Sequence, residues 1–590
     1  MPPVFKKVTL IHLVILALLT AAVFANTLAN DFVWDDNFLI VKNYSLRDVQ
    51  NIPLFFTGHY YGDNLPPSTA HKGYRPIITS SFALDYLLWG LNPRGYHLTN
   101  LLLHVINVLL VYWLVSILAA SYFSSRSADG SARNGFRSLA FITALFFAVH
   151  PIHTESVSYI KNRSDLFAFL FVLLALLFFY LWLSRHQSRR RIIFYVMSLL
   201  CFVLALGAKA IALSLPLVLL LYLICFSRDR SIGKKILATL PFLGLIPLYL
   251  WFREAVLPTA DPGRIPFDLT IWSHLGAILK TLGWYLKMLL APVNLNADHV
   301  FLPPSSFLEA GVLWSIAALL ITGLALLIAM KHSRLVFFGL GWIMISLIPV
   351  SNIVYLYSRP VAEQRLYIPS LGFCLLLALG IQRLFLIKNR YFRIKEVPWI
   401  PYAAILIIGL FYSVTTVQRN FVWHDWLTLF SDSVAASPGS ARVRNNFGLA
   451  LAEKGLYEQA RRQFEAALQL CPDFTEARNN LGTACLDQGK VDEAITHFQA
   501  SLGLDPEYAM AHKNLGVAWR EKGDVDKALF HFRTALRLRP AFPAAHFHLG
   551  LALLDKKDYD RARHHFRRAL EIDPDYAPAA EQLRFYRPSR

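Results

Sequence analysis

Long apolar runs constrain the fold of this chain more than any other feature. A helix of about 20 apolar residues crosses the roughly 30 Å hydrocarbon core of a bilayer. Here 55% of the residues are hydrophobic and 16% are charged, whereas a soluble protein carries about 25% charged residues. A soluble protein is therefore excluded. We expect an all-α polytopic membrane domain with about eleven transmembrane helices, near residues 8–29, 98–120, 138–151, 165–184, 192–208, 210–226, 236–252, 311–330, 335–355, 366–387 and 398–417.

The stretch from Ile271 to Pro292 is a twelfth candidate. It carries Lys280 and Lys287 on one helical face, with leucines elsewhere around the helix. This pattern is typical of an amphipathic helix that lies in the membrane interface or re-enters it. We therefore predict eleven crossings and one interfacial or re-entrant helix.

Basic residues indicate the orientation. With the N-terminus in the cytoplasm, the predicted cytoplasmic segments hold 20 Lys/Arg and 3 Asp/Glu. The rest of residues 1–438 holds 15 Lys/Arg and 16 Asp/Glu. Cytoplasmic loops carry such an excess. Most of the net charge of +19 is thus a sign of topology, and nucleic acid is not an expected partner. The predicted inside segments are the extreme N-terminus, 121–138, 185–191, 227–235, 331–334 and 383–396.

The last quarter of the chain is different in composition and repeats itself. Residues 439–590 hold 23 Lys/Arg and 20 Asp/Glu. From residue 441 onward, four kinds of residue recur at a period of 34, as in tetratricopeptide repeats, where small residues let two antiparallel helices approach and Pro ends the second helix. The four columns are Gly448, Gly482, Gly516 and Gly550; Ala460, Ala494, Ala528 and Ala562; Phe464, Phe498, Phe532 and Phe566; and Pro472, Pro506, Pro540 and Pro574.

The apolar runs and the repeat columns together give the predicted domains. The chain divides into a membrane domain at 1–420, a linker at 421–440, the repeats and a C-terminal end at 577–590. The four repeats are 441–474, 475–508, 509–542 and 543–576. Such a superhelix binds a protein or an extended peptide and supplies no chemistry.

Asparagines recur at one position of the repeats. Asn446, Asn480 and Asn514 either hydrogen-bond a bound peptide or satisfy polar groups within the repeats themselves. Both interpretations remain open at the level of sequence.

The first external loop, residues 30–96, opens with an acidic pair. Asp35 and Asp36 follow Trp34 directly after the first apolar run, at the expected boundary between membrane and water. Two adjacent carboxylates there either bind a divalent cation or act as a general base. A solvated loop turn is the alternative.

Other external segments supply cations. The segment 150–165 contains His150, His153 and Glu155, whose spacing fits no common zinc motif. Several basic side chains at this level suit a phosphate, although each of them taken singly is also explained by snorkelling to lipid headgroups. The candidate phosphate partners are Lys161, Arg163, Lys209 and Arg365.

The order of these motifs resembles one known family. The motifs are Phe32-Val-Trp-Asp-Asp36, Tyr74-Arg-Pro76, Leu91-Asn-Pro-Arg-Gly-Tyr-His97, His150-Pro-Ile-His-Thr-Glu155 with Arg163 and Asp165, and Glu363 to Gly372, followed by the repeats. They are similar to those of the transmembrane and tetratricopeptide-repeat O-mannosyltransferases. These enzymes are GT-C glycosyltransferases related to the protein O-mannosyltransferases. The resemblance extends over nearly the whole chain.

This resemblance implies transfer of a sugar, mannose or a similar one, from a polyprenyl-phosphate donor to an acceptor hydroxyl outside the cytoplasm. The family's catalytic acidic motif matches Asp35 and Asp36, which would also hold a divalent cation if one is used; no other cofactor is implied. One-step displacement would invert the anomeric centre. Two departures from the family pattern are Ala210, where relatives have an acidic residue after the Lys, and Asn162, where relatives often have Gly. The residues implied in binding the donor are Arg75, His150, His153, Glu155, Lys161, Arg163, Asp165, Lys209, Arg365 and Tyr367.

Two other functions are compatible with a membrane domain followed by repeats. One is an O-antigen ligase or polymerase, although such enzymes place their large loop late in the chain, whereas the longest loop here is the first. The other is a non-catalytic membrane-anchored scaffold, which leaves the polar segment 150–165 unexplained. The compact repeat array favours a bacterial inner membrane with periplasmic repeats; in a eukaryote the repeats would lie in the lumen of the endoplasmic reticulum. The membrane lipid and a protein or peptide acceptor are the expected partners.

Overall fold

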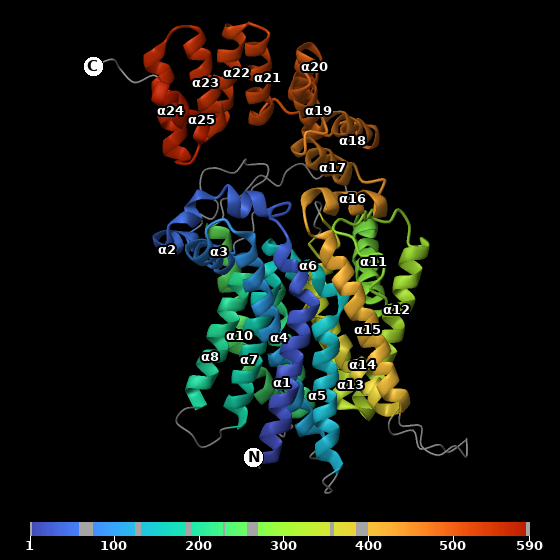
Figure 1. Ribbon diagram of the computed structural model, residues 1–590. Coiled ribbons are helices and arrows are strands. Elements are labelled where there is room, and N and C mark those ends of the chain that lie inside the picture. The colour runs from blue at the N-terminus through green and yellow to red at the C-terminus, as the bar shows by residue number, and fades with distance from the viewer. Residues whose placement is uncertain are drawn as a thin grey trace. The chain divides into compact units, whose positions relative to one another are not determined.

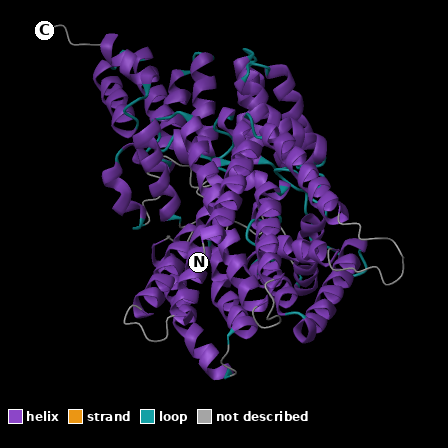
Figure 2. Ribbon diagram, turned by 60° about the horizontal axis from the view of Figure 1, so that its bottom comes forward, coloured by secondary structure: helices purple, strands orange, loops and turns teal. Residues whose placement is uncertain are grey.

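The fold is helical throughout the part of the chain that the structure describes. The computed structural model describes residues 3–57, 75–123, 131–184, 191–227, 231–256, 270–354, 359–384 and 399–585. Figure 2 shows helices and loops, and none of these residues forms a strand. The predicted all-α fold class is therefore confirmed. Tyr74, the basic run at 388–395 and the end at 586–590 lie outside the described residues.

The chain forms two compact units. The first comprises the described residues of 1–36, 46–60 and 72–425. The second comprises residues 37–45 and those of 426–590 that are described. Residues 37–45 thus pack with the repeats, where the hydroxyl of Tyr44 donates a hydrogen bond to Asp573.

Long helices build the first unit (Figure 1). Many of their apolar side chains stay exposed: Leu320 of α12 is 69% exposed and Leu406 of α15 is 69% exposed. In water such a surface would be unfavourable, whereas in lipid it is the stable state of a membrane helix. The helices are α1 Pro3–Phe24, α3 Pro76–Trp89, α4 Pro93–Phe123, α5 Ser131–Val149, α7 Arg163–Ser184, α8 Arg191–Ala208, α9 Leu215–Phe226, α10 Ile232–Val256, α11 Ile271–Leu290, α12 Ala310–His332, α13 Arg334–Leu347, α14 Ser370–Leu384 and α15 Trp399–Val422.

The lengths and composition of these helices show a membrane protein. Among the described residues, seven helical segments are long and apolar enough to cross a bilayer, at 8–29, 93–122, 160–184, 191–208, 232–255, 310–332 and 399–422. Four shorter apolar helices lie at 138–149, 210–226, 334–350 and 370–383. Each of the eleven apolar runs expected from the sequence coincides with one of these segments. Helix α11, the expected interfacial or re-entrant helix, is in neither set.

The second unit is a stack of helix pairs. After α16 (Trp426–Ala436), each 34-residue repeat contributes two helices, and the tetratricopeptide type of the repeats is confirmed. A Cβ atom added to Gly482 would lie 2.7 Å from the ring of Phe498, so the Gly and Phe columns correspond to close helix contacts. The helices are α17 Ala441–Glu453, α18 Tyr457–Leu470, α19 Thr475–Asp487, α20 Val491–Leu504, α21 Ala509–Glu521, α22 Val525–Leu538, α23 Pro543–Asp555, α24 Tyr559–Ile572 and α25 Ala577–Phe585.

Asparagines join successive repeats. The side chain of Asn480 donates to Asn445 at 2.9 Å, and that of Asn514 donates to Asn479 at 2.9 Å. These bonds occupy the amide groups within the repeat stack. The structure thus supports the interpretation in which the recurring asparagines satisfy polar groups of the repeats.

Candidate functional site

The acidic pair lies at the end of a short loop that follows α1 and the 3₁₀ turn Ala25–Ala29. Asp36 is fully buried, and its carboxylate accepts the backbone N–H of Lys161 at 2.9 Å and that of Val33 at 3.3 Å. Burial raises the pKa of Asp36 to about 8, against the effect of these two hydrogen bonds. Both carboxylates were expected at the boundary between membrane and water; the structure shows Asp36 enclosed within the protein, because the loop folds it inward.

Asp35 has a different environment. Its side chain is 17% exposed and forms an ion pair with the ammonium group of Lys161, which is 18% exposed. Its backbone N–H donates to the hydroxyl of Tyr159 at 3.0 Å. Asp35 is therefore the member of the pair that a solute can reach.

A stack of aromatic rings holds this loop in place. Trp34 stacks on Tyr159 at 5.9 Å, and Tyr159 stacks on Trp423 at 5.2 Å. Trp34 has a φ of 53°, in the left-handed region that bulky residues rarely adopt. Such backbone strain persists only where the surroundings impose it, and here the stack does so immediately before the acidic pair.

A buried carboxylate is connected to the aromatic stack through Arg359. Glu155, in the short helix α6 (Thr154–Ser158), pairs with Arg359 at 2.8 Å and accepts the backbone N–H of Gln364 at 3.1 Å. Burial raises the pKa of Glu155, whereas Arg359 lowers it. The guanidinium of Arg359 also lies 5.3 Å from the ring centre of Trp34. Glu155 therefore supports the acidic loop through Arg359 and Trp34.

The two histidines of the segment 150–165 are part of the core. His153 is hydrogen-bonded to Ser370 at 2.8 Å, and His150 accepts the backbone N–H of Ile152 at 3.2 Å. Burial lowers the pKa of His150 to about 3, so this ring is neutral at pH 7. Within the described ranges, no group of three or more His, Cys, Asp or Glu side chains is arranged to hold a metal ion.

Arg163 is enclosed by other side chains. It is fully buried and pairs with Asp85 of α3 at 2.6 Å. Its Nε donates to Asn100 at 2.7 Å and one Nη donates to the carbonyl of Tyr96 at 2.9 Å. With the guanidinium occupied on all sides, the geometry favours a structural role in joining α3, α4 and α7 over contact with a phosphate.

A second group of cations surrounds Asp165. The buried Asp165 carboxylate accepts two hydrogen bonds from the Lys209 ammonium group, at 2.6 and 2.8 Å. Burial lowers the pKa of Lys209 to about 8; Asp165 opposes this shift, and the positive charges of Arg75 and Arg365 add to it. Lys209 is the cation bonded to Asp165, and Arg75 and Arg365 are near enough to act on both groups electrostatically; we call Arg75, Lys209 and Arg365 the basic cluster. Asp165 lies in the first turn of α7, four residues after Lys161, which pairs with Asp35.

Two of these candidates are held by the protein itself. Arg365 donates to the carbonyl groups of Pro360 and Arg359, each at 2.6 Å. Tyr367 is buried and its hydroxyl is hydrogen-bonded to His104 at 2.7 Å, in the core. Of the cluster's cations, Arg75 and Lys209 are the ones best placed to contact a ligand.

Several residues of the site were not among the sequence candidates: Tyr159, Arg359, Asp85 and Trp423. Tyr159 stands inside the polar segment 150–165, which was a usable signal. Arg359 and Trp423 come from segments far along the chain, and only the fold brings them to the acidic loop.

The fold and site together define a polytopic helical membrane protein with a polar site at the helix ends and tetratricopeptide repeats. A family model described as tetratricopeptide repeat matches residues 445–509, 479–540 and 520–577. Over most of its length the chain is similar to curated protein O-mannosyl-transferases, as the sequence motifs suggested. One is F38B6.6 of Caenorhabditis elegans, 27% identical over 78% of this chain and 63% of the relative. TMTC3 of Mus musculus is 27% identical over 80% of this chain and 51% of the relative. TMTC1 of Homo sapiens is 27% identical over 76% of this chain and 54% of the relative. The chain thus spans about half to two thirds of the length of these relatives.

Two solved structures are similar to about a third of this chain. MamA is 24% identical and covers 28% of this chain and 95% of its own, with a TM-score of 0.24. The tetratricopeptide protein YrrB is 22% identical and covers 31% of this chain and 91% of its own, with a TM-score of 0.23.

Proposed function

We propose that this protein is a membrane glycosyltransferase that moves mannose, or a similar sugar, from a polyprenyl-phosphate donor to a hydroxyl group of a protein. The names of the similar proteins support the reaction class. The observation that carries the proposal is the contrast within the acidic pair: Asp36 is buried and bound by backbone N–H groups, whereas Asp35 is partly exposed and paired with Lys161.

In this proposal Asp35 is the general base. It takes the proton of the acceptor hydroxyl as the oxygen attacks the anomeric carbon, while the bond from that carbon to the phosphate oxygen breaks. Attack from the side opposite the phosphate inverts the anomeric centre. Lys161 holds Asp35 in place before the acceptor arrives. Asp36 and Tyr159 fix the loop backbone, and so act as positioning residues.

The departing phosphate needs positive charge. In this proposal the cluster of Arg75, Lys209 and Arg365 supplies it, with Asp165 holding the Lys209 ammonium group in position. Cations directed at the place where negative charge develops stabilise the transition state. No metal ion is required for this role, although a divalent cation beside Asp35 is compatible with the chemistry of a carboxylate.

The repeats recruit the protein acceptor in this proposal. They lie on the same side of the membrane as the acidic pair if the basic loops are cytoplasmic, because the C-terminal end then follows an odd number of crossings. In a bacterium this side is the periplasm.

A direct test uses the full-length protein in lipid nanodiscs with a Ser/Thr-rich peptide, and detects hexose addition by mass spectrometry. We expect addition when polyprenyl-phosphate mannose is supplied. A nucleotide-linked mannose and a peptide with Ala in place of every Ser and Thr serve as controls and should give no product. Transfer from the nucleotide sugar alone, or to the Ala peptide, would contradict the proposal.

A further inference from the structure

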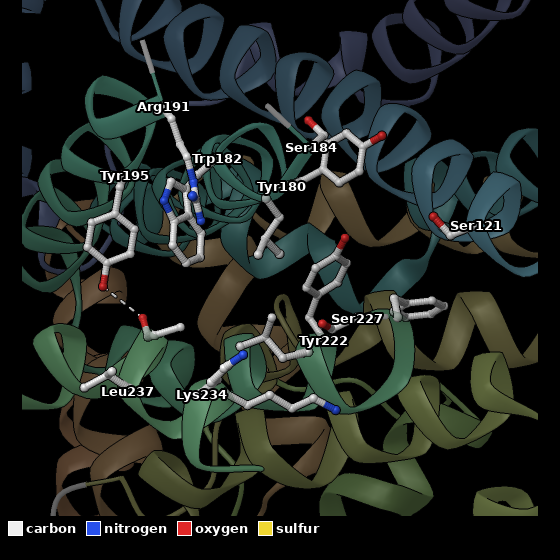
Figure 3. Close-up of a pocket in the computed structure, with 15 residues that line it drawn as sticks. Ser121, Tyr180, Trp182, Ser184, Arg191, Tyr195, Tyr222, Ser227, Lys234 and Leu237 are labelled. Carbon is white, nitrogen blue, oxygen red and sulfur yellow. Dashed lines mark hydrogen bonds between the residues drawn. The ribbon is translucent and has the colours of Figure 1, made fainter. Parts of the chain in front are cut away.

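A pocket of about 780 Å³ lies among the ends of α4, α7, α8, α9 and α10. Figure 3 shows its polar side chains converging from these different helices. None of the residues described above as part of the candidate site lines it. This pocket is therefore a separate feature of the membrane unit.

The pocket and the acidic pair lie at opposite ends of the same helices. Near the start of α4, Asn100 bonds Arg163 at the start of α7; near their other ends, Ser121 and Ser184 line the pocket. The stretch of α4 from Asn100 to Ser121 is about 32 Å long at 1.5 Å per residue, which is about the thickness of the hydrocarbon core. A lipid phosphate in the pocket would therefore belong to the leaflet opposite the acidic pair.

The pocket is basic. Arg191, Lys234 and Lys235 line it, and no acidic residue is among the described lining residues. The guanidinium of Arg191 lies 5.0 Å from the ring centre of Trp182, which orients it, and its Nε is buried with no hydrogen-bond partner among the described residues. A buried donor without a partner is costly, and an anionic oxygen would satisfy it.

The rest of the lining suits a headgroup attached to acyl chains. Tyr195 donates its hydroxyl hydrogen to the carbonyl of Ala238 at 2.9 Å, and Trp182 and Tyr222 supply further ring surface. Aromatic side chains of this kind gather at the level of lipid headgroups. Next to them, Leu237 is 66% exposed, so apolar surface continues from the pocket toward the lipid.

We propose that this pocket binds the headgroup of an anionic phospholipid, with its phosphate between Arg191 and the two lysines. This pocket is not the site of the sugar donor, because the donor's phosphate must reach the acidic pair at the opposite end of the helices. The apolar surface next to the pocket favours a phospholipid over a free phosphate ion, because acyl chains can pack on that surface and a free ion cannot. The site stands apart from the transfer reaction and does not depend on the proposed function.

The test measures lipid retention by native mass spectrometry of the full-length, detergent-solubilised protein with phosphatidylglycerol or phosphatidylcholine added. We expect tighter binding of phosphatidylglycerol. Each basic side chain near a lipid surface is worth about 1 kcal/mol, so Lys234→Gln/Lys235→Gln should weaken phosphatidylglycerol binding on the order of tenfold and leave phosphatidylcholine binding unchanged. Arg191→Gln should act in the same direction.

The control is Lys331→Gln, which removes an exposed basic residue at the end of α12. It should leave phosphatidylglycerol binding unchanged. Unaltered binding in both pocket variants, or an equal loss in the control, would overturn the proposal. Lys234 is exposed and Lys235 is half-buried, so their replacement should not unfold the protein. Displacement of the bound lipid by millimolar inorganic phosphate would identify a free-phosphate site and would also overturn it.

Discussion

Lys161 is bonded to Asp36 through its backbone and not through its side chain: its N–H donates to the buried carboxylate at 2.9 Å. Its ammonium group pairs instead with Asp35. The 3₁₀ turn Ile160–Asn162, near the end of the polar segment 150–165, thus holds both carboxylates of the loop, but in different ways. One becomes part of the framework, and the other stays accessible for chemistry.

The buried carboxyl should make stability depend on pH. Because the pKa of Asp36 rises from its usual 3.8 to about 8, the folded protein binds a proton that the unfolded chain releases over this range. The stability contributed by this group is present at low pH and lost as the pH rises toward 8. We expect the apparent Tm of the parent, relative to Asp36→Asn, to fall between pH 5 and pH 8. A constant difference in Tm across this range would contradict the assignment.

Tyr159 should matter through its hydroxyl as well as its ring. Tyr159→Phe keeps the stack with Trp34 and Trp423 but removes the acceptor for the Asp35 N–H, so we expect a loss of about 1 kcal/mol in stability. Transfer should also slow, with the KM for the donor unchanged. Tyr159→Leu also removes the ring contacts and should cost about 1 kcal/mol more. Equal stability of the Phe and Leu variants in thermal unfolding would argue against the stack.

Arg75 should act on the donor. A hydrogen bond to a charged group is worth about 1.5–3 kcal/mol, so Arg75→Gln should raise the KM for the polyprenyl-phosphate donor about tenfold or more. Its kcat should fall as well, because the same cation stabilises the departing phosphate in the transition state. Arg94→Gln removes an exposed cation at the start of α4 and is the matched control. If both variants raise the KM equally, general surface charge explains the effect and the cluster does not bind the phosphate.

Replacing either of two glycines in neighbouring helices by Ala should change the stability of the repeats, in opposite directions. Gly482→Ala places a methyl group 2.7 Å from the Phe498 ring and should destabilise the repeats by about 1–3 kcal/mol. Gly503 lies in α20 with nothing within 4 Å of its added Cβ, so Gly503→Ala should stabilise them by about 0.4–1 kcal/mol. Hydrogen exchange of the repeat helices in the full-length protein measures both effects.

Local patterns predicted most of the architecture. Apolar runs and a 34-residue period are properties of adjacent residues, so they indicate membrane helices and repeats without knowledge of the fold. The burial of Asp36 was not predictable in this way, because it depends on the backbone N–H of Lys161, which lies 125 positions away. The position of Arg163 was missed for the same reason: its partner Asp85 is on another helix.

The candidate phosphate partners illustrate the same limit. Charge and position relative to the membrane suggested Arg163, Lys209 and Arg365 as equivalent cations. The structure separates them: Arg163 pairs with Asp85, Arg365 donates to backbone carbonyl groups, and Lys209 pairs with Asp165. Only the contacts of each side chain could make that distinction.

The central claim is that Asp35 is the general base of sugar transfer. The most direct test is the rate of peptide glycosylation by Asp35→Asn, with Asp31→Asn as the control, since Asp31 is an exposed acid of the same loop. General-base catalysis is typically worth about 10² to 10⁴ in rate, so Asp35→Asn should lose activity by a factor of this size while still binding the donor. Asp31→Asn should keep the parental rate. Transfer by Asp35→Asn at the rate of the parent would contradict the account.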